Sequence, residues 1–402
     1  MAQQQLKREL GMFGAIVTGL GSILGTGAFV AIALASERWA DAVLWAVPLA
    51  ACVAVFNGLS SAFLAGLFPV AGGTYEYGYQ ALNPWLGFTA GWLFLLAKTA
   101  SAATAALGVA LYLGTDSFLV PLGAVALITV LVIAGLRRTT VVNSILITIT
   151  ISAILWFALQ AATGGLGDVV NFAEPTTTGG GVLAATAFLF VAYTGYGRIA
   201  TLGEEVKDPA RTIPRAVVVT LAVAASLYMA IELGGRAWAG PNWGGVFNLS
   251  RFIDWGFVRF GAITAMLGVL LNLVLGLSRV WLAMGRRGDM PSPLARLDKR
   301  SEPTIAVIVT TVFIAGLTLV GDIALAWSFS AMTVLLYYGI TNLAALAIDR
   351  RRPTAWLGLG SCLFLSFFVP PIVWAVGAGM VVLGLLWKTG FRELRSVPSQ
   401  TL

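Results

Sequence analysis

The sequence predicts an all-α integral membrane protein with twelve transmembrane helices. Hydrophobic residues make up 58% of its 402 residues and charged residues only 11%, whereas a soluble domain carries about 25% charge. The mean hydropathy is +0.88. The few charged residues also divide the chain into uncharged runs, and a membrane-spanning helix needs roughly 20 apolar residues. Composition and charge spacing therefore exclude a soluble enzyme and a disordered scaffold.

Most spans follow from one uncharged run each, taken in order along the chain. The third span is accepted although it contains one cation, Lys98. The last long run is divided into two short helices because Pro370 and Pro371 interrupt it. The expected spans are approximately 12–35, 42–67, 86–113, 119–136, 141–163, 181–203, 215–234, 257–285, 304–320, 323–347, 354–369 and 371–387.

The distribution of lysine and arginine predicts the orientation of the chain. Most of the 25 cations lie in alternate loops, together with the two termini, and few lie in the loops between them. Because cytoplasmic loops carry the excess of Lys and Arg, both termini are expected in the cytoplasm. This bias accounts for the net charge of +7 without a nucleic-acid partner.

Catalytic and metal chemistry have little support in this composition. The chain has no histidine, and its two cysteines, Cys52 and Cys362, both lie in apolar runs. The usual neutral-pH proton relay and most transition-metal sites are therefore missing. We expect no catalytic residue, no metal site and no cofactor, and hence a protein that is not an enzyme.

Two spans contain glycine-rich segments that predict broken helices. The first span carries G-L-G-S-I-L-G-T-G over residues 19–27, and the sixth carries F-V-A-Y-T-G-Y-G-R over residues 190–198. Either segment alone is compatible with close helix packing. The two are five spans apart, and a repeat of five helices enters the membrane in the opposite direction the second time. Paired interruptions at corresponding positions favour a transporter binding site.

Four motifs resemble the amino acid–polyamine–organocation (APC) superfamily. They are GSILGTG at residues 21–27, FPVAGGTY at 68–75, GEEVKDP at 203–209 with TIPRA at 212–216, and the segment from Ser278 to Pro291. The resemblance covers about residues 11–350 and implies a LeuT-like fold within a single permease domain, residues 1–402. That fold has two inverted five-helix repeats, about 12–163 (spans 1–5) and 181–347 (spans 6–10). Spans 11 and 12 form an appended hairpin, about 354–387, and helices 1 and 6 are discontinuous.

The resemblance implies a secondary carrier of amino acids or related amines, working by alternating access. We expect it in the plasma membrane of a bacterium. Proton coupling and exchange are the expected modes. A sodium-coupled symporter of amino acids or amines is the alternative within transport, and a membrane amino acid sensor without transport is the alternative from another class. Spans 3 and 10 contain no acidic residue, which favours small or neutral substrates over cationic ones.

An amino acid presents a carboxylate and an ammonium, and the first break suits the carboxylate. The second half of the broken helix begins near Gly25, where free N–H groups and the positive helix end favour an anion. By resemblance, the ammonium lies on carbonyls of both breaks. The expected substrate-binding residues are Gly21, Ser22, Ile23, Gly25, Thr26, Gly27, Phe190, Val191, Tyr193, Thr194 and Gly195.

Two residues are candidates for coupling. Sodium-independent members of the superfamily often carry a lysine in span five, and the matching position here is Thr150. One interpretation is that Lys98 supplies the missing cation from span three or carries the coupled proton. The other is that Thr150 leaves room for sodium. The remaining interpretation is a purely structural lysine, whose ammonium is satisfied by backbone carbonyls or reaches the membrane surface along its aliphatic stem.

Two further intramembrane cations predict an ion pair near the cytoplasmic end. Arg198 follows the second break, and Arg279 lies low in span eight. Both spans run in the same direction, so Arg279 is expected to pair with Glu204 or Glu205. Such a pair would serve as an inner gate or hold the fold together.

Overall fold

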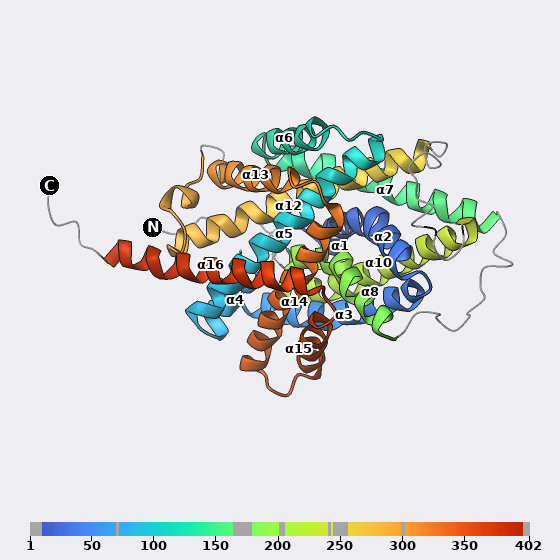
Figure 1. Cartoon of the computed structure of the whole chain (residues 1–402). Coiled ribbons are helices and arrows are strands. Elements are labelled where there is room, and N and C mark those ends of the chain that lie inside the picture. Colours follow the sequence, from blue (N-terminus) through green and yellow to red (C-terminus); the bar gives the residue numbers. More distant parts are fainter. Residues whose placement is uncertain are drawn as a thin grey trace.

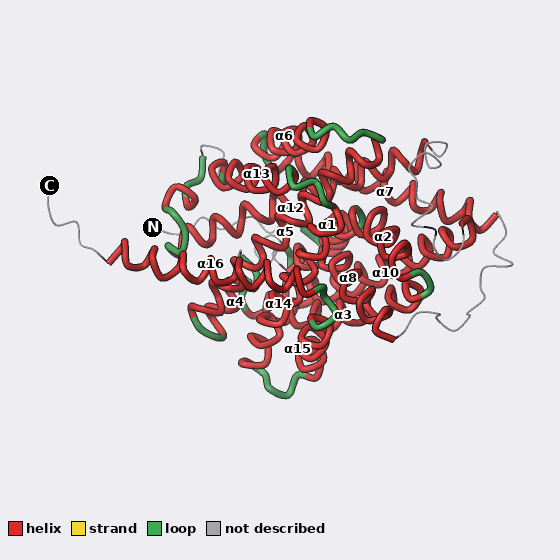
Figure 2. The backbone as a smooth tube through the Cα atoms, viewed as in Figure 1, coloured by secondary structure: helices red, strands yellow, loops and turns green. Residues whose placement is uncertain are grey.

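The structure of the chain is a computed structural model. Its long helices coincide with the uncharged runs of the sequence from which the spans were predicted. The structure describes residues 10–69, 72–163, 179–200, 206–239, 243, 256–298 and 302–396. Almost all of this part is helical, with short loops between the helices (Figure 2).

The first half of the chain contains the two halves of the first span and the helices that follow it (Figure 1). Its elements are α1 (Met12–Ile23), η1 (Gly27–Ala31), α2 (Ile32–Trp39), α3 (Ala42–Leu67), α4 (Thr74–Ala81), α5 (Pro84–Leu113), α6 (Leu119–Ile133) and α7 (Leu136–Thr163). The second half contains α8 (Gly179–Tyr193), η3 (Thr194–Tyr196), α9 (Gly197–Ala200), α10 (Pro209–Ala239), α12 (Gly256–Arg287), η4 (Ser292–Ala295), α13 (Thr304–Thr318), α14 (Ile323–Ile348), α15 (Pro353–Ser366) and α16 (Pro371–Ser396).

Every expected span coincides with helix, but the helices differ in length. Within the described residues, nine helical segments are long and apolar enough to cross a membrane. Helices α6 and α13 have 15 residues each and α15 has 14, fewer than the 17–25 or so that a span usually needs. The chain is thus a multi-pass membrane protein, while the count of twelve crossings stays a prediction. The expected break at Pro370–Pro371 is confirmed, because α15 ends at Ser366 and α16 begins at Pro371.

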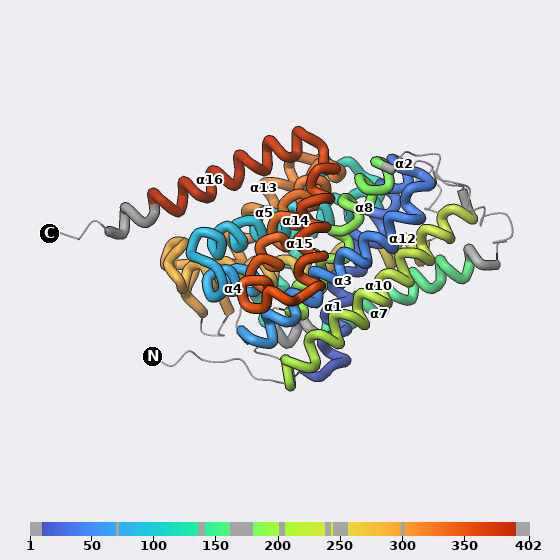
Figure 3. Tube along the Cα trace, turned by 90° about the horizontal axis from the view of Figure 1, so that it is seen from below, coloured from blue at the N-terminus to red at the C-terminus, as the bar shows by residue number. Residues whose placement is uncertain are grey.

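Three pairs of helices that correspond under an offset of five spans pack against each other. Helix α3 contacts α10, α5 contacts α12, and α6 contacts α13. In the last pair the hydroxyls of Thr129 and Thr311 lie 2.7 Å apart. These contacts are those expected of elements around a two-fold axis, and the inverted repeat itself stays a prediction. Helix α16 runs along the edge of the bundle (Figure 3), where it packs mainly against α14 and α5.

A buried ion cluster joins the turn between α2 and α3 to α10. The Arg236 guanidinium donates to Glu232 Oε1 at 2.7 Å, to Asp41 Oδ1 at 2.8 Å and to the Ala40 carbonyl at 2.8 Å. The Trp243 indole N–H donates to the second Glu232 oxygen at 2.9 Å. Glu232 is fully buried, so both of its oxygens depend on these protein partners.

Candidate functional site

The first span is broken where the sequence predicts it. Helix α1 ends at Ile23, and Leu24 has extended backbone angles, φ −79° and ψ 90°. Helical structure resumes at Gly27 as a π-helical turn and continues into α2. An extended residue inside a span frees backbone groups from the helical hydrogen-bond ladder, which is tolerated only where protein or a cavity surrounds them.

The sixth span is interrupted at the corresponding place, by a milder distortion. Helix α8 ends at Tyr193, a 3₁₀ turn covers Thr194–Tyr196, and α9 begins at Gly197. The flanking residues keep right-handed helical angles. The two interruptions touch: a Cβ placed on Gly195 would lie 2.2 Å from the carbonyl oxygen of Ser22. Only glycine permits this approach of the two backbones.

Buried side chains from other helices contact the backbone groups freed at the first break. The Tyr228 hydroxyl of α10 lies 2.8 Å from the Ile23 carbonyl and 3.0 Å from the Ala192 carbonyl. Asn272 Nδ2 of α12 lies 3.3 Å from the Gly21 carbonyl and donates to Asn143 Oδ1 at 2.7 Å. Sequence reasoning missed these partners. The available signal was their polarity, since tyrosine hydroxyls and asparagines inside apolar spans need hydrogen-bond partners.

Lys98 reaches the second break from α5. Its side chain is 7% exposed, and its Nζ donates to Thr194 Oγ1 at 2.9 Å. The Thr194 hydroxyl in turn donates to the Val191 carbonyl at 2.8 Å. None of the ion pairs among the described residues includes Lys98. The ammonium is therefore held by a hydroxyl rather than by a carboxylate.

A small cavity lies between the two breaks and Lys98. Its volume is about 20 Å³, enough for about one water molecule. Of the expected residues, those lining it are Ser22, Ile23, Thr26, Gly27, Lys98, Val191, Thr194 and Gly195. Ser101, Ala192, Val269, Leu273 and Trp327 complete the lining. The Thr26 hydroxyl oxygen is buried here without a hydrogen-bond partner among the described residues.

The other expected binding residues lie behind this lining. Gly21 and Gly25 pack against neighbouring helices, and a Cβ on Gly25 would lie 2.2 Å from Val269 Cγ2. Phe190 packs edge-on against Tyr338. Tyr193 donates its hydroxyl to the Val47 carbonyl at 3.1 Å.

Thr150 is separate from the cavity. It is buried in α7, and its hydroxyl donates to the Leu146 carbonyl of the same helix at 2.8 Å. Thr150 is not among the residues that line the cavity. The structure therefore brings Lys98, and not Thr150, to the two breaks.

The expected partners of Arg279, Glu204 and Glu205, lie outside the described residues. Within the described part, Arg279 Nη2 lies 3.3 Å from Glu302 Oε2, a carboxylate that sequence reasoning had not considered. Arg198 lies half-buried in α9, directly after the second break.

A multi-pass helical bundle with two interrupted helices around one small polar cavity has the architecture of a membrane transporter. Comparison with known proteins gives the particular family: the sequence profile named Amino acid permease matches residues 14–390. The chain belongs to this family, and thus to the APC superfamily predicted from its motifs. It is a transport protein and not an enzyme.

Similar proteins are transporters as well. An uncharacterized transporter of Mycobacterium tuberculosis is 37% identical, over 95% of this chain and 90% of its own length. The branched-chain amino acid permease BcaP of Bacillus subtilis is 28% identical over 76% of this chain and 73% of its own. The methylthioribose transporter of Bacillus subtilis is 24% identical over 95% and 93%.

Proposed function

We propose that this chain carries small or neutral amino acids across the plasma membrane of a bacterium by alternating access, with proton coupling or exchange. The observation that carries the proposal is the pair of polar groups facing one cavity at the two breaks. The Thr26 hydroxyl is buried there without a described partner, and the Lys98 ammonium has a hydroxyl as its partner. A buried polar group left unsatisfied costs about 1–3 kcal/mol, which a ligand group bound there would recover.

The two end groups of an amino acid match the two kinds of backbone group at a broken helix. The carboxylate would bind the N–H groups at the start of the second half-helix, near Gly25–Gly27, with the Thr26 and Ser22 hydroxyls beside them. The ammonium would bind carbonyls that point away from the helical ladder. The Ser22 carbonyl is a candidate, since it faces Gly195 across the contact between the breaks.

The size of the cavity supports a cycle that opens and closes. A volume of about 20 Å³ accepts one water but no amino acid, so this conformation is closed around the site. Binding would require the two breaks to separate, and each break supplies a point about which a half-helix can move. The proposed moving units are the two repeats, about 12–163 and 181–347, with the hairpin of about 354–387 at their edge.

Two observations support a neutral substrate. Among the residues lining the cavity there is no carboxylate that would pair with a cationic side chain. The relative BcaP is named for branched-chain amino acids, which are neutral. The methylthioribose transporter is similar over almost the whole chain, so the substrate screen should extend beyond amino acids.

Lys98 is the proposed coupling residue. Its ammonium lies at the second break and contacts the Thr194 hydroxyl, so a change in its charge acts directly on the segment that must move. Thr150 is the proposed residue for the sodium alternative, in which its hydroxyl would leave its own helix to face an ion. The gate predicted for Arg198, Arg279, Glu204 and Glu205 stays a prediction, as does the cytoplasmic location of both termini.

Uptake into liposomes tests the proposal. Purified protein is reconstituted and screened with radiolabelled neutral, acidic and cationic amino acids and with methylthioribose. Each substrate is measured with and without a sodium gradient, a pH gradient and internal amino acid. We expect uptake of small or neutral amino acids that is driven by a pH gradient or by internal substrate and is indifferent to sodium.

Each arm of this experiment has an outcome that contradicts part of the proposal. Sodium-driven uptake would replace the proton or exchange mechanism with symport. Substrate binding without any uptake or exchange would favour the sensor. Failure to bind or move any amino acid would overturn the assignment of substrate.

A further inference from the structure

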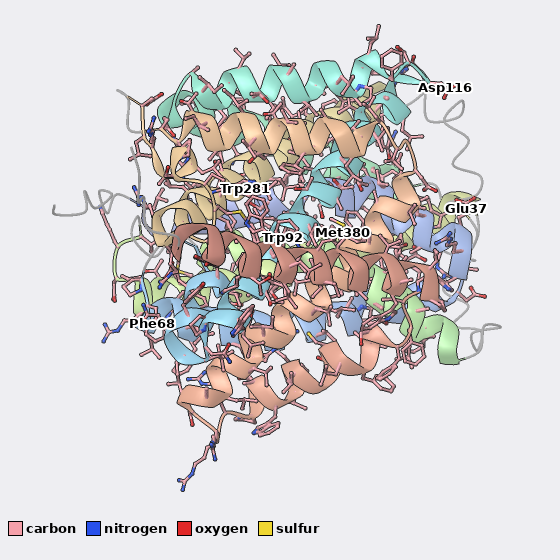
Figure 4. The ribbon with its side chains drawn as sticks, turned by 60° about the vertical axis from the view of Figure 1, so that its left-hand side comes forward. Glu37, Phe68, Trp92, Asp116, Trp281 and Met380 are labelled. Atoms are coloured by element: carbon pink, nitrogen blue, oxygen red, sulfur yellow. The ribbon has the colours of Figure 1, made fainter. Side chains whose placement is uncertain are left out.

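A second, larger cavity lies on the outside of the bundle, far larger than the cavity at the breaks. It is a groove of about 510 Å³, within the range of about 300–1,000 Å³ typical of small-molecule sites. Its walls come from α5, α12, α13, α14 and α16. Figure 4 shows Trp281 and Trp92 in the space between α13 and α16, with Met380 on α16 beside them.

The walls of this groove are aromatic and apolar. The Trp281 ring stacks on Phe313 with centroids 5.7 Å apart. The Trp92 indole N–H donates to the Met380 carbonyl at 2.8 Å, so its polar atom is already satisfied. Walls made mostly of aromatic and aliphatic side chains suit hydrocarbon and not a polar solute.

One carboxylate, that of Asp322, lies at the end of the groove. Asp322 lines it and lies in the turn between α13 and α14, where a span meets the aqueous boundary. Its Oδ1 accepts from the Leu325 N–H at 2.9 Å and caps α14. Asp322 is exposed and belongs to none of the ion pairs among the described residues.

We propose that this groove binds one acyl chain of a phospholipid whose headgroup carries an ammonium, and that Asp322 pairs with that ammonium. The apolar walls take the chain, and the exposed carboxylate at the boundary selects an amine-bearing headgroup over an anionic one. With the proposed orientation, in which both termini are cytoplasmic, the turn at Asp322 faces the outer leaflet. The site is separate from the substrate cavity and does not depend on which amino acid is carried.

The single carboxylate favours a lipid over a helix from a second copy. A lipid with an ammonium headgroup brings the charge opposite to that of Asp322, together with an acyl chain for the apolar walls. A single acyl chain is thin enough to enter the groove along its length.

Filling the groove tests the proposal. Gly316 lines it, and a Cβ on Gly316 meets nothing within 4 Å, so Gly316→Phe places a ring in the groove without a backbone clash. Gly360 on α15 is the matched control, because a Cβ there also meets nothing within 4 Å and it lies outside the groove. Gly316→Leu is a smaller filler that serves if the phenylalanine variant does not fold.

The readout is the number of phospholipids retained per protein in native mass spectrometry. The protein is released from vesicles that contain equal molar amounts of phosphatidylethanolamine and phosphatidylglycerol. We expect wild type and Gly360→Phe to retain one more phosphatidylethanolamine than Gly316→Phe does. Asp322→Asn keeps the helix cap and should retain the two lipids equally.

Three results would overturn the proposal. Equal lipid retention by the Gly316 and Gly360 variants would show that the groove holds no chain. Equal retention of the two lipids by wild type would remove the pairing with Asp322. A dimer lost only in Gly316→Phe would assign the groove to a second copy. Because no substrate is added, these outcomes are independent of the uptake measurements.

Discussion

Replacing Thr26 by valine should change stability and substrate affinity in opposite directions. Valine keeps the branched shape but removes the hydroxyl oxygen, which is buried in the cavity without a described hydrogen-bond partner. Leaving such an oxygen unsatisfied costs about 1–3 kcal/mol. One water fits in the cavity and would form a hydrogen bond with this oxygen, which lowers the cost in the wild type. Without substrate, the Thr26→Val variant should therefore be as stable as wild type or up to about 1–3 kcal/mol more stable.

With substrate bound, the same change should be harmful. A hydroxyl that donates to a carboxylate forms a charge-assisted bond worth about 1.5–3 kcal/mol. Its loss corresponds to a roughly 10- to 150-fold weaker Kd. Thermal unfolding without substrate measures the change in stability. Equilibrium binding of the radiolabelled substrate found in the uptake screen measures the change in Kd.

The matched control is Thr310→Val. Thr310 is equally buried, but its hydroxyl donates to the Ala306 carbonyl of its own helix at 2.8 Å. That variant should lose a little stability, about 0.5–1.5 kcal/mol, and keep its affinity. The reasoning is refuted if Thr26→Val is destabilised like the control and binds substrate as wild type does.

Three further predictions concern charge and close packing. Lys98→Ala should abolish uptake or its pH dependence in liposomes, and unchanged pH-responsive uptake would disprove the coupling role. Gly195→Ala should cost about 1–3 kcal/mol in thermal unfolding and slow uptake, because its Cβ would lie 2.2 Å from a carbonyl of the first break. Gly339→Ala, where a Cβ meets nothing within 4 Å, is the control. Glu232→Gln leaves the buried Arg236 with a weaker partner and should lower the free energy of unfolding by up to about 3–5 kcal/mol; unchanged stability would show that the pair contributes nothing.

The sequence predicts the helices and their interruptions because both are encoded locally. The uncharged runs place the helix of every expected span but not the short helix α4, which contains Glu76. The glycines at 19–27 and 195–197 mark the two breaks. Span length is less well encoded: the expected span at 304–320 includes Leu319 and Val320, which belong to the turn after α13. Apolar turn residues next to a helix have the same hydropathy as the helix itself.

The contacts of the site are less accessible to sequence reasoning because they join distant spans. Nothing local indicates that Tyr228 reaches the Ile23 carbonyl or that Arg279 lies beside Glu302. Lys98 was recognisable as unusual from its position alone, but its partner Thr194 depends on how α5 packs against the second break. The direction in which an aromatic ring points is likewise set by packing, and Tyr193 lies behind the cavity lining rather than in it.

The close contact between Gly195 and the Ser22 carbonyl has a consequence for the empty protein. Each elementary charge that crosses a membrane gains or loses about 2.3 kcal/mol per 100 mV, so a continuous wet path through the bundle would dissipate the ion gradients of the cell. With the two backbones in contact, the space between the breaks holds about one water molecule. A larger residue at position 195 would hold the breaks apart, and we expect the resting membrane of such a variant to conduct ions.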